Sequence, residues 1–176
     1  MYGILLEGLH EYVISKYGQE AWDSLRQSVD YEETSFKSTT SYPESLLPSL
    51  IASAAEAFSI NPDDLRYSLG EHFVTYLTEH GYGGMVRILG RNIRDFLDGL
   101  DNMHKYLRFT FPCLQYPLFF CANESRTGIS LQYTSRRPNF THYVRGIICE
   151  ISKQCFNIKM NIEVSWTVWF SRTCGR

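Results

Sequence analysis

The chain has 176 residues, enough for one domain of ordinary size and too few for two. Hydrophobic residues make up 44% and charged residues 20%, a balance that excludes a disordered chain. With 17 Lys and Arg against 19 Asp and Glu, the net charge of -2 does not favour nucleic acid or an anionic membrane as a partner. No apolar run approaches the ~20 residues of a membrane span.

The N-terminus and the cysteines predict the cellular compartment. No basic leader opens the chain, and acidic residues interrupt its early apolar stretch, so we expect no secretory signal. The five cysteines are odd in number and form no C-x-x-C pair. These features predict a cytoplasmic protein with reduced thiols.

Helical spacing of apolar residues dominates the first two thirds of the chain. It predicts helices over residues 4–17 and 20–28, with Gly18 as the stop between them. A polar connection is expected over 30–42. Pro43 then suits the first position of a helix that runs to Phe58.

The segment Asn61-Pro62-Asp63-Asp64 is a compact helix start signal. Asn suits the N-cap, Pro the first helical position, and the two acids favour the positive end of the helix dipole. The helix should continue to the glycine-rich turn at 81–84. A short helix over 85–89 follows, and a long one begins near Asn92 and extends to Leu107.

The pattern changes to strand-like alternation beyond residue 112. Strands are expected over 117–121 and 129–137, a helix over 140–156, and a further strand over 158–170. A helical front joined to a small antiparallel sheet with packed helices is an α+β fold.

One face of the strand over 129–137 carries apolar residues and then Tyr133, Ser135 and Arg137. A buried arginine needs an anionic partner, and three donors at a period of two would clamp a carboxylate well. The alternative is that the strand end leaves the core and Arg137 pairs with a local Asp or Glu. The alternation alone leaves both readings open.

His104 lies on the apolar stripe of its predicted helix. A neutral imidazole in an apolar pocket is the usual proximal ligand of haem iron. The alternative is a buried histidine whose ring is satisfied by a backbone carbonyl. The remaining histidines show no metal-ligand spacing.

Motifs typical of enzymes are missing from the sequence. The Gly81-x-Gly83-Gly84 run has no preceding strand and no Lys-Ser/Thr, so it predicts a helix-ending turn rather than a phosphate loop. No Gly-x-Ser-x-Gly is present, and no paired carboxylates or Cys/His arrangement support catalysis. We therefore expect this chain not to be an enzyme.

Several short motifs together resemble the H-NOX domain, the haem nitric oxide/oxygen binding domain of soluble guanylate cyclase beta-type subunits. They are Met1-Tyr2-Gly3, Arg87-Ile88-Leu89-Gly90, Asp95 to Asp101, Leu100-Asp101-Asn102-Met103-His104, Tyr116-Pro117, and Tyr133-x-Ser135-x-Arg137. The resemblance covers residues 1–164 as an H-NOX domain, with 165–176 as an atypical tail. The pattern is similar to the oxygen-responsive cyclases of invertebrates.

The resemblance implies a cofactor and roles for the site residues. The cofactor would be haem b, ferrous iron protoporphyrin IX, with His104 as the proximal iron ligand. Pro117 would press on the porphyrin and Leu5 would line its other face. Three residues would hold the haem propionates: Tyr133, Ser135 and Arg137.

The resemblance also places Tyr143 and Phe73 in the distal pocket, where NO, O2 or CO would bind. Bound O2 gains from a hydrogen-bond donor such as Tyr143, whereas NO binds ferrous haem well without one. The alternative for Tyr143 is a tyrosine that packs at a helix edge. Phe73 adds no donor.

The implied function is a gas sensor that regulates guanylate cyclase and cGMP signalling, with cyclase subunits as partners. Gas binding opposite His104 would shift its helix between two states. The chain itself contains no cyclase segment and would make no cyclic GMP. The alternative function is a haem-free interaction module that pairs with a cyclase partner.

Overall fold

The computed structural model describes residues 3–31, 33, 35–111, 115–125 and 128–165. Seven α-helices, a kinked turn η1 in which Gly81 has a positive φ, and two strands are found there, in an order of helices, strands and a last helix that confirms the α+β class. The elements are α1 (Ile4–Tyr17), α2 (Gln19–Ser28), α3 (Leu46–Ala57), α4 (Pro62–Leu77), η1 (Thr78–Tyr82), α5 (Gly83–Ile88), α6 (Ile93–Thr110), β1 (Leu118–Ala122), β2 (Ser130–Thr134) and α7 (Thr141–Phe156).

Two helices begin where the sequence predicts. The Asn61 side chain accepts a hydrogen bond from the Asp63 backbone N–H at 2.8 Å, and Asn92 accepts one from Asp95 at 2.9 Å. The predicted start of α3 at Pro43 is wrong by three residues. The Pro43 carbonyl instead accepts from the Leu46 N–H in a turn that precedes the helix.

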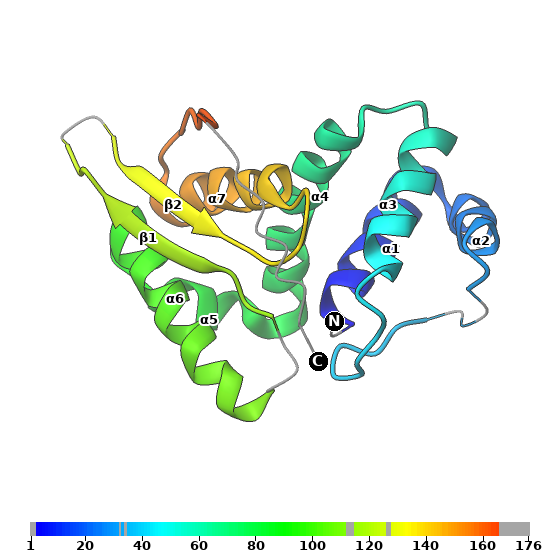
Figure 1. The fold of residues 1–176 in the computed structure, drawn as a ribbon, viewed down its shortest axis with the longest axis horizontal. Coiled ribbons are helices and arrows are strands. Elements are labelled where there is room, and N and C mark those ends of the chain that lie inside the picture. Colours follow the sequence, from blue (N-terminus) through cyan, green and yellow to red (C-terminus); the bar gives the residue numbers. More distant parts are fainter. Residues whose placement is uncertain (1–2, 32, 34, 112–114, 126–127, 166–176) are drawn as a thin grey trace, which may run out of the picture.

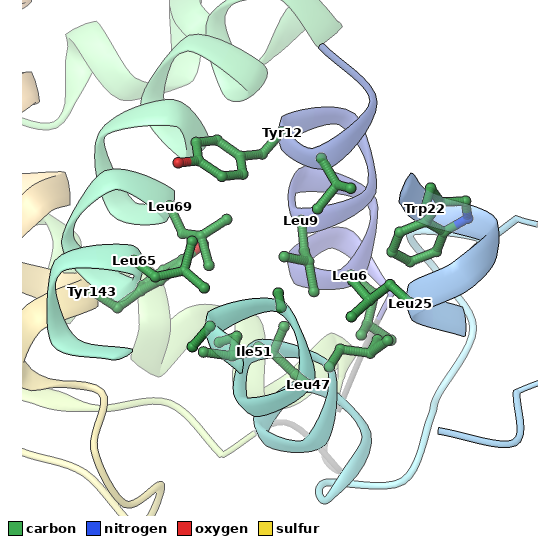
Figure 2. Packing of buried hydrophobic residues seen from close by; sticks show 14 of the residues in the cluster. Leu6, Leu9, Tyr12, Trp22, Leu25, Leu47, Ile51, Leu65, Leu69 and Tyr143 are labelled. Carbon is green, nitrogen blue, oxygen red and sulfur yellow. The ribbon is translucent and has the colours of Figure 1, made fainter. Parts of the chain in front are cut away.

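The N-terminal helices enclose one hydrophobic core (Figure 2). Trp22 of α2 and leucines of α1, α3 and α4 are almost completely buried there, as the transfer of apolar surface out of water requires. The labelled members are Leu6, Leu9, Tyr12, Trp22, Leu25, Leu47, Ile51, Leu65, Leu69 and Tyr143. We call this group the N-terminal core.

A second hydrophobic cluster, the C-terminal core, joins α4, α5, α6, β1 and α7. Its buried members are Val74, Val86, Phe96, Leu97, Phe119, Cys121, Ile148 and Ile151. Figure 1 shows α1 to α3 on one side of the molecule and α5, α6 and the sheet on the other. Both α4 and α7 supply residues to the two cores, so these two helices connect the halves.

The crossing of α4 and α7 depends on two glycines. A Cβ atom at Gly70 would overlap the carbonyl oxygen of Tyr143, and one at Gly146 would overlap the carbonyl oxygen of Tyr67. The two backbones are therefore in direct contact, which only residues without a side chain permit. This contact fixes the position of Tyr143 relative to α4.

The strands β1 and β2 pair antiparallel, with Phe119 opposite Tyr133 and Cys121 opposite Leu131. The predicted alternation of burial along 129–137 is present. The predicted length of the second strand is wrong, because β2 ends at Thr134. Ser135 and Arg137 therefore lie in the connection that leads to α7.

The predicted strand over 158–170 is also wrong in its described part, since residues 158–165 form no strand. Met160 and Ile162 pack against the C-terminal core, whereas Ile158 and Val164 are exposed. In this segment the alternation predicts the buried side chains only in part. A strand also needs a backbone partner, and within the described residues β1 and β2 pair with each other and with no third strand. The rest of that prediction, and the tail beyond residue 165, lie outside the described residues.

The cysteines at 121, 149 and 155 carry free thiols, whereas Cys113 and Cys174 lie outside the described residues. Across the described parts of the chain, no helix has the length and apolar character needed to cross a membrane.

Candidate functional site

His104 lies on α6 with its imidazole between two aromatic rings. The Tyr116 ring stacks on it at a centroid distance of 4.8 Å, and the Phe119 ring of β1 is 6.1 Å away. These rings surround the imidazole with apolar surface. The amphipathic stripe of α6 brings His104 to the sheet because the same face carries the leucine and phenylalanine residues of the C-terminal core.

This environment keeps His104 neutral. Burial lowers the pKa of the imidazole to about 4, and the charge of Asp101 and the backbone of Pro117 oppose that shift only in part. The Pro117 backbone carbonyl acts on the ring as a weak hydrogen-bond acceptor, and the buried Nδ1 atom makes no hydrogen bond of full geometry. A neutral imidazole with an unsatisfied ring nitrogen is suited to binding a metal.

Asp101 positions the sheet against the helix that carries His104. Its carboxylate is 9% exposed, accepts a hydrogen bond from the Phe119 N–H at 3.2 Å and pairs with the Lys105 Nζ at 2.7 Å. Asp101 is part of the motif that resembles the H-NOX family, but the sequence predicted no role for it. Its spacing of three residues before His104, which puts both on one face of a helix, could have drawn attention to it.

Tyr133 is connected to His104 through Phe119. Phe119 and Tyr133 pair across β1 and β2, and their ring centroids are 5.6 Å apart. Burial raises the pKa of Tyr133, so its hydroxyl stays protonated. Pro117 is half-buried immediately before β1. We call His104, Tyr116, Phe119 and Tyr133 the histidine cluster.

Arg137 binds a carboxylate of the protein itself. Its guanidinium donates to both oxygens of Glu44, with Nε–Oε2 at 2.9 Å and NH2–Oε1 at 3.3 Å. The Ser135 hydroxyl accepts from the Arg137 backbone N–H at 3.0 Å. The partner is not the local acid that we considered from the sequence, since the two residues are 93 positions apart. No sequence signal distinguished Glu44.

A cavity of about 160 Å³ lies beside this ion pair. Its lining residues are Glu44, Pro48, Gln115, Arg136, Arg137, Pro138 and Phe140. Small-molecule pockets usually measure roughly 300–1,000 Å³. The cavity therefore has room for a group of carboxylate size.

Tyr143 and Phe73 meet between α7 and α4. Tyr143 is 5% exposed, and its ring centroid lies 6.0 Å from Phe73 and 5.2 Å from Phe140. Burial raises the pKa of the Tyr143 hydroxyl, which therefore stays protonated. Leu5 and Phe73 are half-buried against the N-terminal core, which also contains Tyr143. We call Tyr143, Phe73 and Phe140 the tyrosine cluster.

Arg137 links the two clusters. Its guanidinium lies 5.7 Å from the ring centroid of Phe140, and it follows Tyr133 by four residues. The structure thus places Tyr133 and Pro117 beside His104, and Arg137 beside Tyr143. Leu5 packs against the N-terminal core, in the half of the molecule that holds the tyrosine cluster.

A comparison of the whole sequence with protein families shows which family the chain belongs to. The model of the haem-NO-binding family, HNOB, matches residues 2–164. The chain belongs to the haem-NO-binding (H-NOX) family.

Related sequences include soluble guanylate cyclases of invertebrates. Soluble guanylate cyclase gcy-31 of Caenorhabditis elegans is 37% identical over 164 residues, covering 93% of this chain and 23% of the relative. Soluble guanylate cyclase 89Db of Drosophila melanogaster is 32% identical, covering 93% and 24%. The H-NOX chain thus spans about a quarter of the length of these relatives.

Solved H-NOX structures have the same fold. An H-NOX protein from S. oneidensis in the Fe(II)NO ligation state superposes with a TM-score of 0.77 at 18% identity, covering 89% of this chain and 86% of that one. An oxygen-binding H-NOX domain related to soluble guanylate cyclases, in its oxygen complex, gives 0.73 at 19% identity, covering 89% and 81%.

H-NOX domains bind haem, and the residues present here fit that group. The described side chains contain no cluster of three or more His, Cys, Asp or Glu that could hold a bare metal ion. A haem brings four nitrogen ligands of its own, so its iron needs one protein imidazole. His104 offers that imidazole, whose buried Nδ1 atom makes no hydrogen bond of full geometry, and Arg137 already holds a carboxylate in two-point geometry.

Proposed function

We propose that this H-NOX domain is a gas sensor that binds haem b through His104 and binds NO, O2 and CO on the opposite side. The observation that carries the proposal is the neutral imidazole of His104, enclosed by Tyr116 and Phe119 and joined through Phe119 to Tyr133. A ligand histidine on α6, packed against β1, and a carboxylate clamp that follows β2 suit a planar cofactor with an acidic edge.

Each residue of the motif then has a distinct task. His104 supplies a ring nitrogen to the iron because burial keeps it unprotonated. Tyr133 and Ser135 offer hydroxyl groups, and Arg137 offers a guanidinium, to the two haem carboxylates. When bound, the haem supplies the iron position at which a gas molecule coordinates.

Pro117 and Leu5 shape the space for the porphyrin. Pro117 has a fixed backbone ring and stands directly before the strand whose Phe119 contacts His104, so it can press on the porphyrin from the histidine side. Leu5, on α1, offers apolar surface from the other half of the molecule. The two residues would therefore hold opposite faces of the cofactor.

Tyr143 is the residue proposed to favour O2. A protonated phenol can donate a hydrogen bond to bound O2, which carries partial negative charge, whereas NO gains little from it. Packing against Phe73 and Phe140 accounts for the ring of Tyr143 but assigns no task to its hydroxyl. The adjacent Phe73 has no donor, so Tyr143 would be the donor of the tyrosine cluster.

The proposed output is a shift of α6 relative to the rest of the domain. A ligand can shift such an equilibrium only by binding one state more tightly than the other. Tension on His104 would act on α6 and, through Asp101, on β1, while the α4–α7 contact holds the remainder. We assign gas sensing to residues 1–164 and treat residues 165–176 as a separate tail. We propose that the domain regulates guanylate cyclase subunits and has no cyclase activity of its own.

A haem-free interaction module is the second candidate, and one observation favours it. Arg137 already has a carboxylate partner in Glu44, so the clamp is satisfied without a cofactor. This candidate predicts a colourless protein that co-purifies with a cyclase partner.

Absorption spectroscopy separates the two candidates. The chain is expressed with haem available, purified and reduced, and its spectrum is recorded alone and with O2, CO or NO. The sensor proposal predicts a Soret band that shifts with each gas. A purified protein without a Soret band, which also takes up no haem on titration, would refute it.

A further inference from the structure

The ion pair between Arg137 and Glu44 joins the two halves of the molecule. Glu44 lies just before α3, between Leu47 of the N-terminal core and Tyr42, which is buried in the same hydrophobic cluster. Arg137 follows β2, whose Tyr133 packs against the C-terminal core. A break in this ion pair would therefore remove a direct tie between the segment before α3 and the end of the sheet.

The geometry of the ion pair is that of a guanidinium holding a carboxylate by two parallel hydrogen bonds. The Arg137 side chain is 14% exposed and Glu44 is 39% exposed. Burial alone would raise the pKa of Glu44, but the hydrogen bonds and charge of Arg137 help to hold it below its ordinary value. Glu44 is therefore an ionised carboxylate at neutral pH.

A second carboxylate has access to the same guanidinium. Glu44 and Arg137 both line the cavity of about 160 Å³, together with Arg136 and Gln115, which add hydrogen-bond donors. The haem carboxylates are the acidic groups that the proposed function assigns to Arg137. Two carboxylates in one two-point site repel each other, so they would compete for it.

We infer that Glu44 takes the place of a haem carboxylate on Arg137 in the haem-free chain, and that haem loading displaces it. The inference rests on the proposed function. Glu44 is then a positioning residue that acts through Arg137. The apparent haem affinity then equals the intrinsic affinity multiplied by the fraction of haem-free chains in which Arg137 is not bound to Glu44. When haem binds, Glu44 leaves Arg137 and the segment before α3 is released.

The test compares Glu44→Gln with a matched control, Glu124→Gln. Glu124 also pairs with an arginine from another segment, Arg94, and its exposure makes the substitution equally tolerable. Each full chain is equilibrated with haem and a competing haem-binding protein, and the partition is read from the Soret band. The inference predicts about fivefold tighter haem binding for Glu44→Gln and wild-type binding for Glu124→Gln.

A haem-free measurement tests the other half of the inference. In the chain without haem, Glu44→Gln should lower the stability against urea more in the wild-type background than in an Arg137→Gln background, because only the wild type then loses the ion pair. Equal effects in both backgrounds would show that Glu44 does not act through Arg137, which overturns the inference.

The outcomes distinguish the inference from the function on which it rests. If the wild-type chain takes up no haem, the proposed function and the inference fail together. If it binds haem and Glu44→Gln binds no more tightly than wild type, only the inference is overturned, because the two carboxylates then do not compete.

Discussion

The carbonyl oxygen of Tyr143 lies against Gly70, where a Cβ atom would overlap it. The backbone of the proposed gas-facing tyrosine is therefore positioned by a direct contact between α7 and α4. The position of its hydroxyl depends on this helix crossing, which also joins the two cores.

Gly70→Ala should force the two helices apart. We expect a loss of about 1–3 kcal/mol in the free energy of unfolding, because a methyl group cannot be accommodated against backbone. Gly84→Ala is the matched control, since no atom lies within 4 Å of a Cβ there and the residue is helical. Urea denaturation of both variants measures the difference, and equal stability would contradict the close crossing.

Tyr143→Phe should accelerate O2 release and leave NO binding nearly unchanged. The substitution keeps the ring that packs against Phe73 and removes only the donor. Loss of one hydrogen bond corresponds to about a tenfold higher rate of O2 dissociation. Stopped-flow mixing of the O2 complex with an O2 scavenger measures this rate. An unchanged rate would leave Tyr143 as a packing residue.

Asp101→Ala should destabilise the contact between α6 and β1. The substitution leaves the Phe119 N–H without its acceptor, which costs about 1–3 kcal/mol when the group is buried. Asp98→Ala is the control, because that carboxylate is exposed and pairs only with Arg94 among the described residues. Chemical denaturation of the two haem-free variants gives the comparison, and Asp101→Asn should recover part of the loss.

The haem-free chain should lose stability in acid because of His104. The pKa of His104 is about 4 in the folded chain and near 6.5 when exposed, so the unfolded chain binds the additional proton between these values. Stability contributed by the neutral imidazole is present above pH 6.5 and falls as the pH drops towards 4. Between pH 6.5 and 4, the free energy of unfolding should fall more steeply with decreasing pH for wild type than for His104→Gln. An equal dependence of the free energy of unfolding on pH in both proteins would contradict a buried, neutral His104.

Local signals in the sequence predicted much of the fold. The caps at Asn61 and Asn92 act through hydrogen bonds to residues two or three positions away, and such contacts can be identified from spacing alone. The extent of the strands could not be predicted in this way. Alternation indicates which side chains of β2 face the core, but it does not show whether residues 158–165 find a backbone partner in the sheet.

Part of the candidate site could also be predicted from the sequence, and part could not. The periodicity of their segments drew attention to His104 and to Tyr133, Ser135 and Arg137, but their haem roles came from the resemblance to the H-NOX family. Glu44 was not found, since an ion pair between residues 93 positions apart has no sequence period. The contact of Gly70 with Tyr143 was missed for the same reason.

The bond between His104 and the haem iron is the central claim, and resonance Raman spectroscopy of the reduced, gas-free chain tests it most directly. The account predicts an iron–histidine stretching band in the wild-type chain. The band should disappear in His104→Gly and return at a shifted frequency when imidazole is added to fill the space. A band that persists unchanged in His104→Gly would show that another residue binds the iron.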